Sequence, residues 1–213
     1  MSDIAKIRKE YSLQTLLEIN MAQSPYKQFA NWWDDAIKSE IEEVNAMTLA
    51  TVNHEGNPTA RIVLLKDFDE NGFVFFTNYN SHKGEALSKH PYASLVFFWK
   101  ELERQVRIEG SVSRINETAS DAYFNSRPAE SRIGAWASPQ SQVIANRDIL
   151  EENIKKYQLQ YAGNDIPRPP HWGGYLLRPT LVEFWQGRPN RLHDRILYTL
   201  QIGNEWKIER LAP

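Results

Sequence analysis

The sequence predicts a mostly β protein, a closed or nearly closed barrel with helices packed outside it. Many short segments are rich in β-branched and apolar residues, and turn residues such as Gly, Pro, Asn and Asp separate them. The connections are short, which favours antiparallel neighbours. Only a few segments show helical spacing, so the helices are expected at the periphery of the sheet.

The N-terminal part is expected to be an arm followed by one helix. Residues 1–23 predict a short amphipathic or irregular arm, and residues 24–213 predict the main domain. Ser24 and Pro25 are typical of a helix start, with Ser at the cap and Pro at the first helical position. The apolar residues that follow at helical spacing predict one buried stripe, made of Tyr26, Phe29, Trp33, Ile37, Ile41 and Val44.

The remaining chain predicts strands with a few helices between them. Strands are expected at residues 46–53, 58–66, 73–78, 92–100 and 104–115, with a turn at 67–72 and a short helix at 81–91. Two further helices are expected at residues 117–128 and 145–163. Four short strand-like segments complete the chain: WGGYLLRP, LVEFWQG, DRILYTLQIG and EWKIERL.

Composition excludes several classes of function. The chain has 213 residues, a formal net charge of −2 and 41% apolar residues, which suits one soluble domain and argues against nonspecific nucleic-acid binding. It has no cysteine, so disulfides, thiolate catalysis and Cys-ligated zinc are excluded, and a cytoplasmic location is expected. The polar start MSDIAKIRKEYS predicts no secretory signal, and no apolar run is long enough to cross a bilayer.

Common catalytic motifs are missing from the sequence. The GxGxxG, Walker, HExxH and GxSxG patterns do not occur, and the five histidines are scattered, so no metal site is expected.

Cations and hydroxyls near strand ends and turns are the remaining candidates for chemistry. Thr77, Ser81, His82 and Lys83 lie where a turn enters a helix, which suits an anion; the alternative is a capped surface helix.

A second candidate lies in the helix at 117–128 and just beyond it. Tyr123 and Arg127 share one helix face, and with Ser131 they could hold a phosphate monoester. The alternative is a core tyrosine beside an exposed arginine.

The stretch EFWQGRPNRLHDR is the most specific candidate. On an extended chain Arg191, His193 and Arg195 point to the same side, and Asp194 points to the other. Like charges on one face, next to Trp185, favour a bound anion; a solvated ladder of side chains is the alternative.

Several segments together resemble the pyridoxine/pyridoxamine 5′-phosphate oxidase family. EFWQGRPNRLHDR resembles its C-terminal signature. RIVLLK, FTNYNSHKG, LERQVRIEG, YFNSRP, SRIGAWASPQS, WGGY and WKIERLAP also follow in the family's order and spacing, so the resemblance covers residues 4–213.

The resemblance implies an FMN-binding split β-barrel that works as a homodimer, with FMN at the subunit interface. By motif, the FMN residues would be Arg61, Ile62, Val63, Leu64, Leu65, Lys66, Phe76, Thr77, His82, Lys83, Gln105, Gln140, Ser141, Trp185 and Arg195. The substrate residues would be Arg8, Tyr11, Lys66, Tyr123, Arg127, Ser131, Arg191, Leu192 and His193, with Arg191 and His193 catalytic. Arg61 and Lys66 differ in strand parity, so they are expected to serve different ends of the ligand pair.

The implied reaction belongs to vitamin B6 biosynthesis and salvage. Pyridoxamine 5′-phosphate or pyridoxine 5′-phosphate would be oxidised by O2 to pyridoxal 5′-phosphate, with release of hydrogen peroxide and, from the amine, ammonia. Two features depart from the family pattern: His82 replaces the usual arginine, and the segment after Tyr11 lacks a basic run. The alternatives are another split-barrel flavoenzyme, a non-catalytic pyridoxal-phosphate or flavin carrier and, third, a nucleic-acid-binding barrel.

Overall fold

Nine antiparallel strands form one curled sheet in the computed structural model, which describes residues 3–6 and 9–213. The order along the sheet is β2-β1-β5-β6-β7-β4-β3, and β8 and β9 continue from β7. The strands are β1 (Ala46–Val52), β2 (Pro58–Leu64), β3 (Asp67–Asp69), β4 (Gly72–Asn78), β5 (Tyr92–Trp99), β6 (Arg104–Arg114), β7 (Trp172–Gln186), β8 (Asp194–Leu200) and β9 (Trp206–Leu211). The predicted mostly β class with peripheral helices is confirmed.

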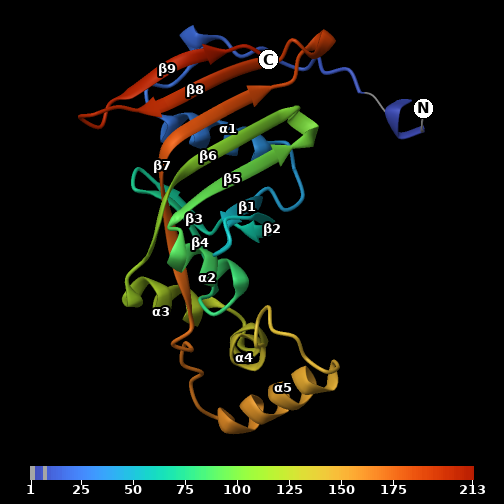
Figure 1. The fold of residues 1–213 in the computed structure, drawn as a ribbon, viewed down its shortest axis with the longest axis vertical. Coiled ribbons are helices and arrows are strands. Elements are labelled where there is room, and N and C mark those ends of the chain that lie inside the picture. Colours follow the sequence, from blue (N-terminus) through green and yellow to red (C-terminus); the bar gives the residue numbers. More distant parts are fainter. Residues whose placement is uncertain (1–2, 7–8) are drawn as a thin grey trace.

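Short helices surround this sheet (Figure 1), and α4 and α5 lie at the end of the molecule opposite β8 and β9. The α-helices are α1 (Pro25–Lys38), α2 (His82–Lys89), α3 (Glu117–Ser126), α4 (Ala129–Ala137) and α5 (Asp148–Gln160). Four 3-10 turns are η1 (Asp3–Lys6), η2 (Glu18–Asn20), η3 (Lys100–Leu102) and η4 (Pro189–Arg191). No helix in the described ranges is long and apolar enough to cross a membrane.

Helix α1 closes one side of the main core with a face that agrees only in part with the predicted stripe. It begins at Pro25, as Ser24-Pro25 indicates, but it ends at Lys38. Phe29 and Trp32 are buried, whereas Ile37 is 52% exposed and Trp33 is only partly buried. The predicted stripe is therefore wrong at Ile37. Ile41 and Val44 do pack against the core, as Tyr26 and Trp33 do, but they follow the end of the helix and not its spacing.

Three other segments differ from their predictions. The turn at residues 67–72 contains the short strand β3, and the unassigned residues after Pro128 form α4. WGGYLLRP and LVEFWQG are not two strands but the single strand β7, which passes through Pro179. Proline lacks an N–H, and Pro179 lies at a bulge of β7. Gly110 pairs with Pro179 and Glu109 with Leu181, so Thr180 has no paired residue in β6 and one ladder bond can be lost without ending the strand.

The long strand β7 changes partners along its length. Its first half pairs with β4, its second half pairs with β8, and β6 pairs with most of it. Residues near Trp172 and residues near Trp185 therefore lie at opposite ends of one element, as the long orange strand in Figure 1 shows.

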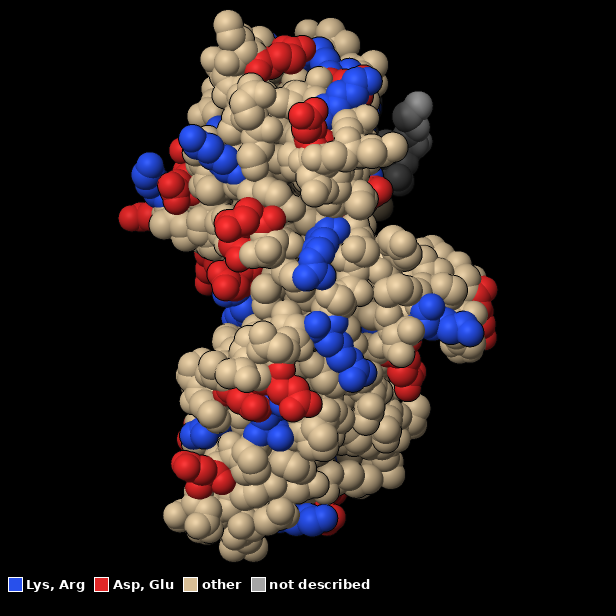
Figure 2. Space-filling view, turned by 90° about the vertical axis from the view of Figure 1, so that its left-hand side faces the viewer, with Lys and Arg blue, Asp and Glu red and all other residues tan. Residues whose placement is uncertain are grey.

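The charged surface does not suggest a polyanion partner. On the face in Figure 2, Lys and Arg side chains alternate with Asp and Glu and form no continuous basic stripe. The formal net charge of the whole chain is −2, and the absence of nonspecific nucleic-acid binding stays a prediction.

We predict that Phe29→Ala strongly destabilises the fold. The Phe29 ring is fully buried and contacts the rings of Phe73 and Phe97 at centroid distances of 4.9 and 5.2 Å. The substitution leaves a cavity, so we expect the free energy of unfolding to fall by about 3–5 kcal/mol, measured by denaturant titration at fixed protein concentration.

The matched control is Ile37→Ala in the same helix. Ile37 is largely exposed, so the change in unfolding free energy should stay within about 0.5 kcal/mol. Equal losses in the two variants would mean that α1 packs through its other face.

Candidate active site

A cationic cluster, defined as Arg61, Thr77, Lys83 and Gln140, forms where β2, β4 and α2 meet the segment after α4. Lys83 Nζ donates to Gln140 Oε1 at 3.0 Å and to Thr77 Oγ1 at 3.2 Å. Arg61 Nη1 donates to Thr51 Oγ1 at 2.8 Å, and its Nη2 donates to Thr59 Oγ1 at 2.8 Å. The hydrogen-bond acceptors of Arg61 and Lys83 are therefore neutral oxygen atoms.

The turn before α2 explains why Lys83 points into this cluster. Ser81 caps the helix and accepts a hydrogen bond from the Gly84 N–H at 3.3 Å. A Cβ at Gly84 would lie 2.2 Å from the Tyr79 carbonyl oxygen, so only glycine allows the turn to close this tightly.

The electrostatics of the cationic cluster favour an anion. Burial lowers the pKa of the Lys83 ammonium, and the nearby positive charge of Arg61 lowers it further. Burial also lowers the pKa of Arg61. Both groups are held as cations at a cost, and a bound anion would remove that cost.

An aromatic stack lies beside the cationic cluster, made of Phe76, Tyr123 and Trp172. The Phe76 ring is 3.9 Å from Tyr123 and 5.4 Å from Trp172. The Arg127 guanidinium lies 4.8 Å from the Trp172 ring, and its Nη1 is buried without a hydrogen-bond partner. Burial lowers the pKa of Arg127, so this cation also lacks compensation.

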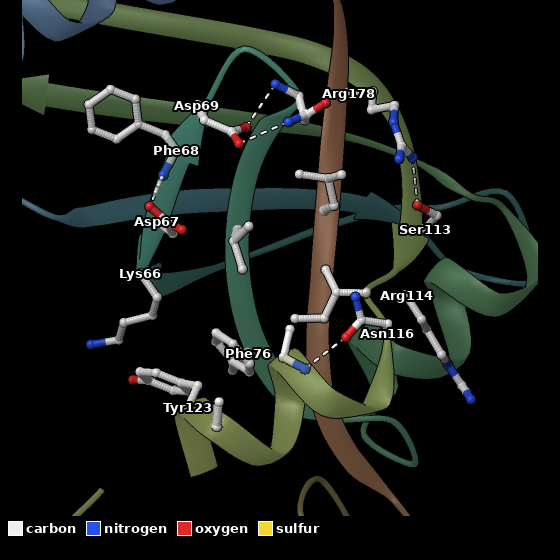
Figure 3. Close-up of a pocket in the computed structure, with 16 residues that line it drawn as sticks. Lys66, Asp67, Phe68, Asp69, Phe76, Ser113, Arg114, Asn116, Tyr123 and Arg178 are labelled. Atoms are coloured by element: carbon white, nitrogen blue, oxygen red, sulfur yellow. Dashed lines mark hydrogen bonds between the residues drawn. The ribbon is translucent and has the colours of Figure 1, made fainter. Parts of the chain in front are cut away.

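Two cavities connect these residues. Lys66, Phe76 and Tyr123 line a cavity of about 620 Å³, and Figure 3 shows Lys66 extending beside Tyr123. Arg127, Ser131 and Gln140 line a second cavity of about 270 Å³. The residues predicted to hold the substrate phosphate therefore lie next to the cationic cluster.

The C-terminal signature forms a separate group at the other end of β7. The Trp185 and His193 rings are 4.5 Å apart, and Tyr11 from the arm contacts them at 5.8 and 6.0 Å. His193 Nδ1 accepts a hydrogen bond from the Arg188 N–H at 3.1 Å. Burial, and then the charge of Arg191, lower the pKa of His193 from its usual 6.5, so the ring is neutral at pH 7 with its proton on Nε2.

The predicted extended ladder of Arg191, His193 and Arg195 is wrong. Residues Pro189–Arg191 form the turn η4, and strand β8 begins only at Asp194. Asn190 and Arg191 both have left-handed backbones, with φ of 54° and 61°. The side chains therefore do not follow strand parity.

Arg195 has the acidic partner that the prediction left out. Its Nε donates to the buried carboxylate of Glu183 at 2.7 Å, and Arg107 donates to the same carboxylate at 2.6 Å. Burial alone would raise the pKa of Glu183, but the hydrogen bonds from Arg195 and Arg107 outweigh it and leave the pKa below 4.5. Arg195 also donates from Nη1 to the Ala212 carbonyl oxygen, so Nη2 remains for a ligand.

The remaining predicted residues fall into three places. Val63 packs against the core and Leu65 is buried in it, so their side chains serve the fold. The outward face of the sheet carries Ile62, Leu64 and Gln105. Exposed positions in turns or helices are taken by His82, Ser141 and Leu192. Arg8 lies outside the described residues.

Two residues of the site were not predicted. Trp172 begins the quoted WGGY motif, and its place before two glycines in a strand was a usable signal of close packing. Glu183 is two residues before Trp185 in the same strand, so strand alternation alone predicts that its carboxylate lies on the same face of the sheet as Trp185.

The comparisons with known proteins agree with this arrangement. The sequence profile described as "Pyridoxamine 5'-phosphate oxidase" matches residues 33–161, and the profile "Pyridoxine 5'-phosphate oxidase C-terminal dimerisation region" matches residues 172–213. A "Pyridoxine/pyridoxamine 5'-phosphate oxidase" of Cyanothece sp. is 58% identical over 99% of this chain and 98% of the relative. The relative of the same name from Polynucleobacter asymbioticus is 57% identical over the full length of both chains.

Two solved structures share the fold. PhzG from Burkholderia lata 383, in complex with tetrahydrophenazine-1-carboxylic acid, is 29% identical with a TM-score of 0.87, covering 95% of this chain and 100% of PhzG. A pyridoxamine 5′-phosphate oxidase-related, FMN binding protein from Nostoc punctiforme has a TM-score of 0.72 at 21% identity, covering 91% of this chain and 100% of that protein. Together these neighbours confirm the split-barrel fold.

We predict that Glu183→Gln removes an acid-sensitive part of the stability. The pKa of Glu183 is lowered in the fold, so its contribution is present above pH 4.5 and is lost as the pH falls through the lowered value. At pH 7 the variant should lose about 1.5–3 kcal/mol of unfolding free energy. The difference from the wild type should shrink as denaturant titrations approach pH 3, and a constant difference would contradict this ionic role.

Proposed function

The chain belongs to the pyridoxamine 5′-phosphate oxidase family, and we propose that it uses FMN to oxidise pyridoxamine 5′-phosphate and pyridoxine 5′-phosphate to pyridoxal 5′-phosphate. Dioxygen is the final acceptor and yields hydrogen peroxide, and the amine substrate also yields ammonia. The name of the full-length relatives supports this reaction.

The observation that carries the proposal is a set of cations without acidic partners. In residues 3–6 and 9–213, no carboxylate forms a hydrogen bond or ion pair with Arg61, Lys66, Lys83 or Arg127. Five other arginines, in contrast, are paired with carboxylates: Arg104, Arg107, Arg168, Arg195 and Arg210. Unpaired, partly buried cations fit two phosphate groups, each held by charge-assisted hydrogen bonds worth about 1.5–3 kcal/mol.

The donors divide between the two phosphates by position. Arg61, Lys83 and Thr77 suit the FMN phosphate, with Gln140 and the N-terminus of α2 nearby. Lys66, Tyr123, Arg127 and Ser131 suit the substrate phosphate: Lys66 and Tyr123 line the larger cavity, and Arg127 and Ser131 line the smaller one. FMN supplies the redox chemistry when bound, as it accepts a hydride from the substrate and passes the electrons to dioxygen.

A complete site requires two copies of the chain. Thr77 pairs with Gly173 at the start of β7, and Trp185 stands twelve residues further along the same strand. At about 3.3 Å per residue this is on the order of 40 Å of strand, much longer than one flavin nucleotide. The cationic cluster of one subunit is therefore completed by the signature group of its partner in a homodimer.

The outward face of the sheet supports this homodimer. It exposes Ile62 and Phe98, which are 64% and 52% exposed, beside Gln105 and Trp185. These exposed apolar side chains favour burial against another protein surface, and the matched dimerisation region contributes β7, β8 and β9 to the same sheet.

Arg191 and His193 orient the substrate in this proposal. The left-handed backbone of Arg191 costs about 1–2 kcal/mol, which the fold tolerates at a turn that presents the guanidinium outward. Neutral His193 has its Nδ1 occupied by the Arg188 N–H, so Nε2–H is a donor toward the ligand. Holding the reacting carbon against the flavin supplies a large part of the rate, and His193 needs no proton transfer for this role.

PhzG provides the specific reason to retain a second candidate, a flavoenzyme acting on another aromatic compound. The difference would lie in the substrate phosphate group of Lys66, Tyr123, Arg127 and Ser131, which a substrate without phosphate does not need. A carrier that binds the vitamer without turnover is the remaining alternative.

We predict that the purified protein binds FMN and produces peroxide in air with either phosphorylated vitamer. The measurement follows peroxide together with formation of pyridoxal 5′-phosphate. The unphosphorylated vitamers are the matched control, and they should react at least about a hundredfold less efficiently because the four phosphate donors stay unfilled. Bound FMN without turnover of either phosphate ester would exclude the proposed reaction.

A second prediction separates the residues that orient the substrate from the residues that bind FMN. Arg191→Ala and His193→Ala should lower kcat/KM at least tenfold while changing FMN affinity less than about threefold, because they orient the substrate. Arg61→Ala and Arg195→Ala should weaken FMN binding instead, measured by quenching of flavin fluorescence. Arg147→Ala, at an exposed residue beside α5, is the control for loss of one positive charge; the same response in all variants would refute the division of roles.

A further inference from the structure

One buried carboxylate has no part in the chemistry proposed above. Glu103 follows η3 in the turn between β5 and β6, and its side chain is only 3% exposed. Its backbone is left-handed, with φ of 54°, which a non-glycine residue rarely adopts. Both the burial and the backbone need an explanation.

The carboxylate of Glu103 binds the N-terminal arm. Its Oε2 accepts hydrogen bonds from the Ser12 N–H at 2.8 Å and the Leu13 N–H at 3.1 Å, and its Oε1 lies 3.3 Å from the Lys9 ammonium. Burial alone would raise the pKa of Glu103, but these amides and Lys9 lower it overall. The charged form is therefore the one that holds the arm.

The backbone of the same residue binds the C-terminal signature. The Glu103 carbonyl oxygen accepts hydrogen bonds from the Gly187 N–H at 2.8 Å and from Gln186 Nε2 at 3.2 Å. Gly187 leaves room for the arm, since a Cβ there would lie 2.7 Å from Cβ of Tyr11. Glu103 thus joins two segments that are far apart in the chain.

The arm segment held by Glu103 contains Tyr11. The Tyr11 ring packs edge-on against Trp185 and contacts His193. The next arm residues have other attachments: Gln14 accepts from Arg188, and the Leu16 N–H donates to Asp194. Loss of the Glu103 carboxylate would therefore free residues 9–13 and leave the later part of the arm in place.

We propose that Glu103 is a positioning residue, whose carboxylate clamps the arm so that Tyr11 lies against Trp185 and His193. This inference rests on the proposed function where it predicts a kinetic effect, and on the structure alone where it predicts the position of Tyr11. The consequence for the site is that the clamp supplies the Tyr11 contact to His193, in addition to the Arg188 N–H and Trp185.

The first test measures the clamp without using activity. Amide hydrogen exchange at Ser12 and Leu13 should accelerate about tenfold or more in Glu103→Ala, as expected for losing a charge-assisted hydrogen bond. In Glu103→Gln the acceleration should be smaller, because an amide oxygen can still accept. Glu101→Ala, at the exposed neighbouring carboxylate, is the matched control and should not change the exchange.

The position of Tyr11 provides a second structural readout. Nuclear Overhauser contacts between the Tyr11 and His193 rings should be present in the wild type and weakened in Glu103→Ala. Unchanged exchange at Ser12 and Leu13, or unchanged ring contacts, would overturn the proposal even if the protein proves to have another activity. If Glu103→Ala does not fold, Glu103→Gln provides the same two measurements.

The kinetic test is a double-mutant cycle in the full chain. Tyr11→Ala and Glu103→Ala should each lower kcat/KM for pyridoxamine 5′-phosphate, and Glu103→Ala should cost less than about twofold once Tyr11 is already alanine. Glu103→Gln should recover part of the loss. Additive effects would show that Glu103 does not act through Tyr11, whereas a wild type without turnover would contradict the proposed function and leave the exchange and ring-contact results to decide the clamp.

Discussion

The length of strand β7 is the constraint on which the rest of the structure depends. One continuous strand, Trp172–Gln186, carries Trp172 with the side chains proposed to bind phosphate at one end and Trp185 with the signature at the other. A bound flavin cannot reach across on the order of 40 Å of strand. The strand therefore holds these two groups of side chains apart within one chain. In the proposed homodimer, a second copy on the outward face of the sheet would bring them together.

The pairing of charges distinguishes the scaffold from the site. Arg107 and Arg195 share the buried carboxylate of Glu183, and these ion pairs hold the sheet face in one arrangement. Arg61 and Lys83, in contrast, have only neutral oxygens as partners in the described residues. Two phosphates bound there, as proposed, would compensate these partly buried cations, although the chain as a whole has a net charge of −2.

Local patterns predicted the elements better than their faces. Ser24-Pro25 marked the start of α1, and alternation marked β1, β2, β5, β6, β8 and β9, because capping and strand parity depend on neighbouring residues. The same reasoning failed for the buried face of α1, where Trp32 and not Ile37 meets the core. It also divided β7 around Pro179, since whether a strand can continue through a proline depends on its register with β6, in which Gly110 pairs with Pro179 and Glu109 with Leu181.

The sequence by itself determined the fold class, the family and the list of candidate residues, because ordered motifs and periodicity are properties of the chain. Only the tertiary structure decided which cations have carboxylate partners and which side chains meet. Glu103 and Ser12 are 91 positions apart, and Glu183 meets Arg195 only because β7 and β8 pair in one particular register. Contacts of this kind depend on strand register and on burial in three dimensions, and neither is encoded by the spacing of nearby residues.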